Sequence, residues 1–371
     1  MRFGRFFLLL IFSLIFSGNL SAQDKKSPEA DDEVLRVETQ LVDVPVVVTD
    51  KAGKPLLNLK QSNFVVFEDG KRQEVSDFAA TSAPFEVALL LDTSGSTRSD
   101  LQLIRRAAES FINSLRAGDK VSIVAFKSFV EDRKSVAMSE VLINLTGDRL
   151  KLKAALEKVK VSNGTPYYDG LLDVAEKVFS DAPKDEFRGR RALVALTDGV
   201  DSTSAAGFAE ARERFNQKGI VSFFIQVDTR EFFESNILGD CEGGMRFSQA
   251  QIRRYYQSFY PKSKIEKVMD FCRLGDFERL DISKRLYELA DLEMQNLAKS
   301  SGGRVFPAAD LSEARAAFSN VAREIGTKYS LGYYSSNEKR DGGYRKIKVE
   351  LKGVPAGAQL RAREGYIAPQ K

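Results

Sequence analysis

The sequence predicts an α/β protein with a doubly wound, mostly parallel sheet, joined to β segments at both ends of the chain. Between residues 84 and 327, apolar runs that suit strands covered on both faces alternate with segments of helical periodicity. Before and after that region, short β-branched runs are separated by turn residues. The chain has 371 residues, 43% of them hydrophobic, which suffices for two or three domains with cores of their own.

Residues 1–22 have the pattern of a secretory signal peptide. Two arginines precede the apolar run Phe6–Phe16, and small residues ending at Ala22 offer a cleavage site before a polar, flexible leader at 23–33. The apolar run is shorter than the roughly 20 residues that a membrane-spanning helix needs. We therefore expect an exported protein, periplasmic or secreted. An uncleaved anchor is the alternative.

Residues 34–83 and 328–371 both have β patterns. Val37–Val48 is rich in β-branched residues, and Asp69-Gly70 between two apolar runs is a strong hairpin signal. We expect the two segments to pair into one sandwich, with the α/β domain (84–327) inserted between them; two separate β appendages are the alternative. The strands expected in the second segment are 328–334, 344–351 and 359–367.

The α/β region begins with the nearly all-apolar strand Phe85–Leu91. Alternation of such strands with helices implies right-handed crossovers and a mostly parallel sheet. The further strands expected are 120–126, 191–196, 220–227 and 304–306, and the helices are 101–115, 149–159, 168–179, 205–217, 285–299 and 311–325.

A long segment, about 229–284, interrupts this alternation and has no obvious core of its own. It holds both cysteines of the chain, Cys241 and Cys272. Export favours a disulfide between them, and two unpaired thiols are the alternative.

The same segment contains a basic aromatic cluster that has three interpretations. It fits base stacking on nucleic acid, a surface for a partner or glycan, or an amphipathic helix whose apolar side faces a core. Export argues against the first. The cluster consists of Arg246, Phe247, Arg253, Arg254, Tyr255, Tyr256, Phe259 and Tyr260.

Composition excludes several functional classes. The chain has no histidine, so it has no Ser-His-Asp triad, Cys-His dyad or histidine-ligated zinc site. Its net charge of +4 arises from 56 basic and 52 acidic residues, a balance that does not suit a general nucleic-acid binder. Any metal must be held by oxygens or by the two cysteines. We expect a binding protein rather than an enzyme.

Oxygen-bearing side chains gather in three loops that can meet at one edge of the sheet. Asp92, Ser94 and Ser96 follow the first strand, Thr165 follows Gly164, and Asp198 follows the strand ending at Leu196. The carboxyl ends of parallel strands are where open α/β sheets bind ligands. Two carboxylates and three hydroxyls suit Mg²⁺, or Mn²⁺ or Ca²⁺, rather than zinc or copper. Such a set leaves coordination positions for water or an outside carboxylate.

This loop also has other interpretations. Ser96 could serve only as the N-cap of the following helix, or the site could be a remnant that binds no ion. Asp92-Thr93 also suits the strand end of an aspartic protease, but Ser94 occupies the glycine position and the chain has no second copy.

The three motifs together resemble the von Willebrand factor type A domain and its metal-ion-dependent adhesion site. They are LLLDTSGS at 89–96, GTPYYDG at 164–170 and ALTDGVD at 195–201. The flanking β segments resemble those of exported bacterial relatives in which such a domain lies within an immunoglobulin-like sandwich. The long segment at 229–284 departs from the short connection usual in the family.

The resemblance implies a role for each site residue. Ser94, Ser96 and Thr165 would bind the ion directly, and Asp92 and Asp198 directly or through water. Asp169 would support the ligands from behind. A partner's Asp or Glu carboxylate would complete the coordination.

The expected function is therefore an exported, metal-dependent protein-binding or adhesion module. The alternative is a structural or assembly module of the cell envelope in which the metal only stabilises the fold. A hydrolase that uses Asp92 is the third class.

Overall fold

The computed structural model describes residues 41–94, 101–131, 134–238, 246–262 and 271–370. The expected signal peptide and leader, Ser96 and Cys241 lie outside these ranges, so the disulfide between Cys241 and Cys272 stays a prediction.

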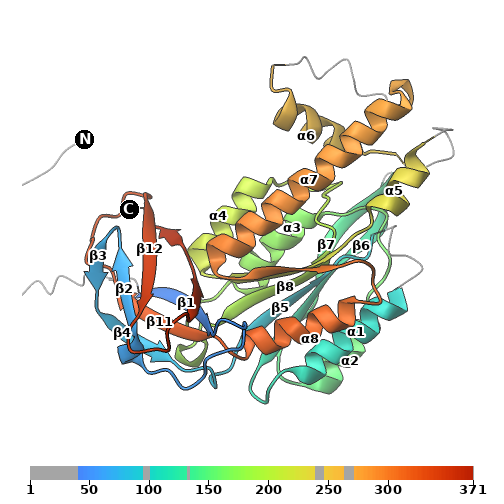
Figure 1. Cartoon of the computed structure of the whole chain (residues 1–371). Coiled ribbons are helices and arrows are strands. Elements are labelled where there is room, and N and C mark those ends of the chain that lie inside the picture. The colour runs from blue at the N-terminus through green and yellow to red at the C-terminus, as the bar shows by residue number, and fades with distance from the viewer. Residues whose placement is uncertain (1–40, 95–100, 132–133, 239–245, 263–270, 371) are drawn as a thin grey trace, which may run out of the picture. The chain divides into compact units, whose positions relative to one another are not determined.

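A six-stranded sheet forms the centre of the α/β domain, in the order β10-β9-β8-β5-β6-β7 (Figure 1). Every neighbouring pair is parallel except β6 and β7. The sheet is thus mostly parallel, as expected. The strands are β5 (Glu86–Leu91), β6 (Lys120–Glu131), β7 (Lys134–Thr146), β8 (Arg191–Thr197), β9 (Val221–Val227) and β10 (Arg304–Ala308).

Helices cover both faces of this sheet, because side chains of its strands alternate between two cores. In β5, Val87, Leu89 and Leu91 belong to one core, and Ala88 and Leu90 to the other. The first core is closed by α1 (Leu101–Ser114), α2 (Arg149–Leu156) and α8 (Ala314–Ile325), and the second by α3 (Tyr167–Asp173), α4 (Phe208–Lys218) and α7 (Asp276–Ser301).

Two elements of this domain differ from expectation. Strand β7 was not expected, because its sequence mixes polar with apolar residues; it pairs with β6 as an antiparallel edge strand. Helix α7 was expected to begin at Arg285 and begins at Asp276. Its apolar stripe changes partner along its length: Ile282 and Leu286 face one core, and Leu297 faces the sheet.

The segment after β9 has a core of its own, contrary to expectation. Helices α5 (Arg230–Ile237) and α6 (Gln249–Phe259) pack with the first half of α7. We call residues 229–290 the helical subdomain. Its core is assembled from short segments that are far apart in the sequence, each with only a few apolar residues, so no single segment indicated it. The residues are Ile237, Phe247, Ile252, Tyr255, Tyr256, Phe271, Leu274, Ile282, Leu286 and Ala290.

Strands from the two ends of the chain pair in two antiparallel sheets, ordered β13-β1-β11-β4 and β14-β12-β2-β3. Strand β1 pairs with β11 and β13, and β2 pairs with β12, so the two β segments are not separate appendages. Both sheets share one apolar core. The strands are β1 (Leu41–Thr49), β2 (Phe64–Glu68), β3 (Lys71–Gln73), β4 (Val75–Ala79), β11 (Tyr329–Tyr334), β12 (Tyr344–Leu351), β13 (Gln359–Ala362) and β14 (Gly365–Ile367).

The last expected strand, 359–367, is instead two strands in different sheets. At the link between them, Arg363 is buried, and its Nε donates to Gly365 O at 2.8 Å. One strand cannot serve both sheets without a bend, and this link supplies it.

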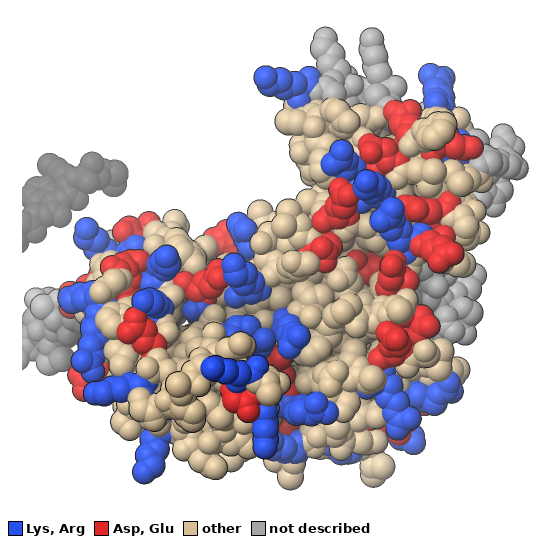
Figure 2. Space-filling view, in the orientation of Figure 1, with Lys and Arg blue, Asp and Glu red and all other residues tan. Residues whose placement is uncertain are grey.

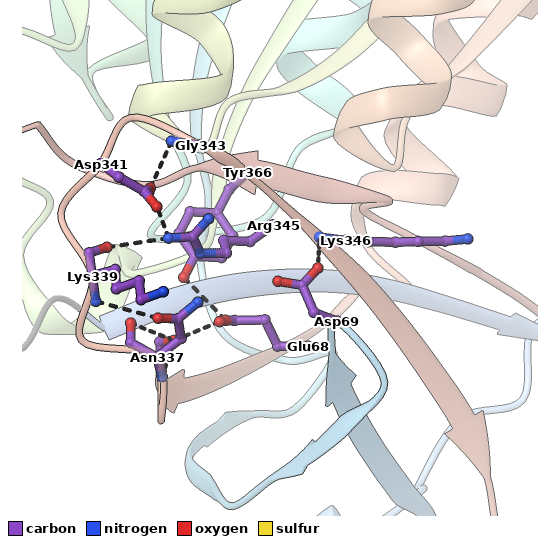
Figure 3. Close-up of polar contacts among 10 residues, drawn as sticks. Glu68, Asp69, Asn337, Lys339, Asp341, Gly343, Arg345, Lys346 and Tyr366 are labelled. Carbon is purple, nitrogen blue, oxygen red and sulfur yellow. Dashed lines mark hydrogen bonds and ion pairs between the residues drawn. The ribbon is translucent and has the colours of Figure 1, made fainter.

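A buried carboxylate organises the polar part of the sandwich. Glu68 is 2% exposed, and its oxygens accept hydrogen bonds from the hydroxyls of Tyr333 at 2.7 Å, Tyr366 at 3.0 Å and Ser335 at 2.6 Å. Figure 3 shows Tyr366 directed at Glu68, with Arg345 bonded to Asp341 beside them. The hydrogen-bonding capacity of Glu68 is thus used within the protein.

Arg190 joins the sandwich to the α/β domain. Its side chain is fully buried, and it donates to Pro84 O at 2.9 Å, Ala83 O at 2.6 Å and Lys328 O at 3.2 Å. These carbonyls lie where the chain enters and leaves the α/β domain. The side chain of Arg190 therefore connects the two linking segments by hydrogen bonds.

Candidate metal site

The candidate site lies where β5 and β8 end side by side. Leu91 is opposite Leu196 in the parallel register, and Asp92 N donates to Leu196 O at 2.9 Å. The chain leaves β5 toward β6 on one side, and it leaves β8 toward β9 on the other. This is the switch point at which open α/β sheets form ligand crevices.

Asp92 is held in the protein by hydrogen bonds from Thr197 and Ser94. Thr197 Oγ1 donates to Asp92 Oδ2 at 2.8 Å, and Ser94 N donates to Asp92 Oδ1 at 3.0 Å. Asp92 is 3% exposed and Ser94 is 7% exposed. Burial raises the pKa of Asp92, and the bonds from Thr197 and Ser94 oppose the increase.

Thr165 is brought to the same place by paired backbone and hydroxyl contacts. Thr165 N donates to Ser202 Oγ at 2.7 Å, and Ser202 N donates back to Thr165 O at 2.9 Å. Ser162 N donates to Thr93 O at 2.7 Å, which fixes this loop against the loop that follows β5. The second motif is therefore bonded to both other motifs.

Asp198 is the fourth expected ligand that lies within the described residues. Its Oδ1 accepts from Val200 N at 2.9 Å, and its Oδ2 accepts from Thr229 Oγ1 at 2.5 Å. Burial raises the pKa of Asp198 to about 7, and the charge of Asp92 adds to the increase. The two carboxylates are thus close enough to destabilise each other's charge.

The donor set fits a hard divalent cation. In the described part of the chain, no Lys or Arg forms an ion pair with Asp92 or Asp198. Two neighbouring buried carboxylates without a basic partner are stabilised by a cation, and the nearby hydroxyls of Ser94 and Thr165 are ligands that Mg²⁺ accepts. Within the described ranges there is no group of three or more His, Cys, Asp or Glu suited to a metal, so hydroxyls are needed here.

The supporting role expected of Asp169 stays a prediction, and the structure shows which backbone groups its side chain binds. Its two carboxylate oxygens accept from Ala205 N at 3.1 Å and Ala206 N at 3.0 Å. It therefore holds the loop that leads into α4. Ser96, the fifth expected ligand, lies outside the described residues.

Asp201 is a supporting residue to which the sequence assigned no role. It is 5% exposed, and its Oδ1 accepts from Tyr167 N at 2.9 Å and from Ser204 Oγ. The bond to Tyr167 fixes the start of α3, directly after Thr165. Its place three residues after Asp198 in ALTDGVD was the available signal.

A small pocket opens beside these ligands. Its volume is about 150 Å³. Loops of the α/β domain and the helical subdomain both line it, which the sequence did not predict. The lining residues are Ser94, Asn163, Gly164, Thr165, Asp198, Val200 and Ser202 from the loops, and Thr229, Phe233, Arg246, Gln251 and Tyr287 from the helical subdomain.

The basic aromatic cluster is mainly part of the helical subdomain's core. Phe247, Tyr255 and Tyr256 are buried, whereas Arg246 and Arg253 are exposed. Acidic and basic side chains alternate on α7, and Figure 2 shows both signs interspersed over this part of the molecule. The amphipathic-helix interpretation is therefore correct for α6, whose apolar side chains belong to the core of the helical subdomain.

Comparison with known families identifies the domain. The model of the von Willebrand factor type A domain matches residues 87–200, which include Asp92, Thr165 and Asp198 and end before the helical subdomain. The chain therefore contains a von Willebrand factor type A domain. No curated protein matches the chain.

Three solved structures that align with this chain have low sequence identity and TM-scores below 0.5. BatB from Bacteroides thetaiotaomicron is 19% identical, with 65% of this chain and 98% of that chain covered and a TM-score of 0.41. A von Willebrand factor type A protein from Catenulispora acidiphila is 12% identical, with coverages of 90% and 75% and a TM-score of 0.42. Proximal thread matrix protein 1 from the mussel byssus, with a zinc-occupied MIDAS motif, is 15% identical, with coverages of 68% and 48% and a TM-score of 0.42.

Similarities this distant say nothing about what the present chain binds. None of the helices within the described ranges has the length and apolarity needed to cross a membrane.

Proposed function

We propose that the protein is an exported, non-enzymatic module that binds a protein partner through a divalent cation, Mg²⁺ or a close equivalent. One observation carries the proposal: two buried carboxylates, Asp92 and Asp198, lie close together without an ion pair to a Lys or Arg among the described residues, and Asp198 lines a pocket that hydroxyls also line. A bound cation would supply positive charge to which a partner's Asp or Glu carboxylate can be attracted.

The chain's own residues would hold and orient the site. Ser94, Thr165 and Asp198 line the pocket, and Asp92 lies at the end of the neighbouring strand. Thr197 and Ser202 fix Asp92 and Thr165 by hydrogen bonds of 2.8 and 2.7 Å. This bracing supports binding by a preformed site, which limits the conformational entropy lost on association.

Ion-dependent capture of a partner tests the proposal. The purified protein is immobilised and exposed to cell-envelope extract in Mg²⁺, then washed and eluted with EDTA. We expect EDTA to release a partner that Asp92→Ala does not retain. Asp185→Ala, which changes an exposed aspartate just before the start of β8, at the opposite end of that strand from Asp198, should retain the partner fully.

Two results would reject the proposal in different ways. Retention of the partner in EDTA, together with an Mg²⁺-dependent rise in the melting temperature, would mean that the ion only stabilises the fold. Turnover of a peptide or phosphoester substrate that is lost in Asp92→Ala would mean that the protein is a hydrolase.

A further inference from the structure

A second hollow lies where the sandwich meets the α/β domain, and it shares no lining residue with the candidate metal site. Its volume is about 900 Å³, within the range of roughly 300 to 1,000 Å³ that is typical of small-molecule sites. Two edge strands, β10 of the central sheet and β13 of the sandwich, border it together with β1, α8 and the turn at 50–55. We call this space, bordered by Lys54, Arg304, Arg323 and Arg361, the junction groove.

Each of these four basic residues comes from a different element. Arg304 lies on β10, Arg361 on β13 and Arg323 on α8, and Lys54 belongs to the turn. Among the described residues that line the groove, Glu324 is the only acidic one. The chain as a whole has 56 basic and 52 acidic residues, so the excess of positive charge is local. Figure 2 shows Lys and Arg side chains gathered where, in Figure 1, the end of α8 meets the sandwich.

Glu324 neutralises only part of this charge. Its carboxylate pairs with Arg361, whereas Lys54, Arg304 and Arg323 form no ion pair within the described ranges. Burial lowers the pKa of Arg361, the charge of Glu324 opposes the decrease, and the charge of Arg304 adds to it. The guanidinium groups of Arg304 and Arg361 are thus close enough to repel each other, and an anion beside them would reduce the repulsion.

The basic side chains are presented by well-braced backbone. Asp50 Oδ1 accepts from Ala52 N and from Lys54 N, each at 2.9 Å, which fixes the turn that carries Lys54. The guanidinium of Arg304 lies over the ring of Phe306, 5.3 Å from its centroid. A groove whose walls are already ordered loses less conformational entropy when a ligand binds.

Neutral hydrogen-bonding groups complete the lining. Thr49 on β1 lies opposite Gln359 on β13, and Gln359 lies on the same face of its strand as Arg361, two residues away. Asn320 adds a second amide from α8. Amides and hydroxyls both donate and accept, so they suit ligand hydroxyls, whereas guanidinium groups suit carboxylates.

We propose that the junction groove binds a small acidic saccharide, a sugar ligand with two or more anionic groups. The three unpaired cations come from three walls, so one anionic group cannot engage all of them. Thr49, Asn320 and Gln359 would bind the sugar hydroxyls. The site needs no divalent cation and is therefore independent of Asp92 and Asp198.

A disaccharide with one carboxylate on each ring, digalacturonate, tests the proposal. Ligand-observed NMR titration of the purified protein in EDTA measures its binding with the metal site empty. We expect binding, and at least tenfold weaker binding of the neutral disaccharide galactobiose and of the dipeptide Glu-Glu. Arg304→Gln and Arg323→Gln should each weaken the binding of digalacturonate by roughly tenfold, because each removes a charge-assisted hydrogen bond.

Two control variants make the result specific. Arg315→Gln changes an exposed arginine on the same helix as Arg323 but outside the groove, and it should bind digalacturonate as the wild type does. Asp92→Ala should also bind it fully, so that failure of the metal-dependent function would leave this inference unaffected. Arg304 and Arg323 are exposed and lie on different elements, so disturbed folding in one variant does not affect the other test.

Three results would overturn the inference. The first is no binding of digalacturonate by the wild type. The second is equally tight binding of galactobiose or Glu-Glu, which would mean that either the charges or the sugar hydroxyls are not recognised. The third is unchanged binding in both Arg304→Gln and Arg323→Gln, which would place the ligand elsewhere on the protein.

Discussion

The molecule buries carboxylates in two regions with opposite outcomes. In the sandwich, Glu68 has three hydroxyl donors, from Tyr333, Tyr366 and Ser335, and is 2% exposed. In the α/β domain, Asp198 has two donors, Val200 N and Thr229 Oγ1, the charge of Asp92 helps to raise its pKa, and it lines a pocket. In the sandwich, hydrogen bonds within the protein stabilise the charge of Glu68. In the α/β domain, a bound cation would be needed to stabilise the charges of Asp92 and Asp198 together.

The comparison shows that residue type alone does not distinguish a structural carboxylate from a ligand. Both regions combine carboxylates with hydroxyls, and both lie beside apolar cores. What differs between Glu68 and Asp198 is the number of donors, three against two, the neighbouring charge of Asp92 and the presence of a space beside Asp198. A buried carboxylate with sufficient donors is stable as it is, whereas one without them requires a counter-charge or a proton.

The largest predicted effect is on Mg²⁺ affinity, which should depend on Asp92 and not on Glu68. Asp92→Ala should lower the affinity for Mg²⁺ by more than roughly a thousandfold, because it removes a charged ligand from a set that has only two. Isothermal titration calorimetry measures the loss. Glu68→Gln is the control, and it should bind Mg²⁺ as the wild type does. Equal loss in both variants would mean that the site responds to general destabilisation.

Lys328 is the opposite case, a buried basic side chain whose charged form is destabilised by burial. Lys328 is 0% exposed, its Nζ donates to Gly302 O at 2.6 Å, and burial lowers its pKa from 10.5 to about 7. Between these two values the unfolded chain binds the proton that the folded protein has lost. The folded protein therefore gains stability as the pH rises from about 7 toward 10.5, and the cost of the buried charge is fully present below 7.

Lys328→Met should lack this gain. The free energy of unfolding of the wild type, measured by urea denaturation, should rise relative to that of the variant by about 2 kcal/mol between pH 7 and pH 9. Lys60→Met, at an exposed position, is the control and should follow the wild type. A constant difference between wild type and Lys328→Met across this range would show that Lys328 stays charged in the fold.

Removal of the Glu68 carboxylate should lower the free energy of unfolding without changing the affinity for Mg²⁺. Glu68→Ala leaves three hydroxyls without their acceptor, at a cost of about 2 kcal/mol in the free energy of unfolding. Glu68→Gln keeps an acceptor oxygen, so its cost should be smaller. Chemical denaturation of the two variants measures this order. A change in Mg²⁺ affinity in Glu68→Ala would contradict the separation of the two regions.

The smallest predicted effect concerns the support of Asp198. Tyr287→Phe removes the hydroxyl beside Thr229, so Thr229 Oγ1 is less firmly oriented toward Asp198. Loss of such an outer hydrogen bond should lower the affinity for Mg²⁺ by roughly tenfold. Tyr260→Phe, in the same subdomain but not lining the pocket, should have no effect. Equal affinities for wild type and Tyr287→Phe would show that the helical subdomain does not position the site.

Much of the α/β fold could be predicted because its strands are buried on both faces. All six residues of β5 and all seven of β8 are buried, and after the paired Glu86 and Arg191 at their first positions each strand is an apolar run of five residues. Edge strand β7 mixes polar and apolar residues, and no such run marks it. The start of α7 was missed because its apolar stripe turns from the sheet to the helical subdomain.

The candidate site could be predicted in part for a similar reason. Asp92, Thr165 and Asp198 belong to short motifs next to strand ends or helix starts, so topology alone brings them together. Thr229 and Tyr287 are 58 residues apart and meet only through the fold of the helical subdomain. Neither belongs to a local pattern, and the sequence gives no signal for the wall that they form.

The most direct test of the metal site is its structure with a bound ion. Crystals soaked in Mn²⁺ give an anomalous signal that locates the ion without reference to the protein coordinates. The account predicts one strong peak bordered by Asp92, Ser94, Thr165 and Asp198, with the nearest ligand oxygens at roughly 2 Å. No peak there under saturating Mn²⁺, or a single peak elsewhere in the molecule, would contradict it.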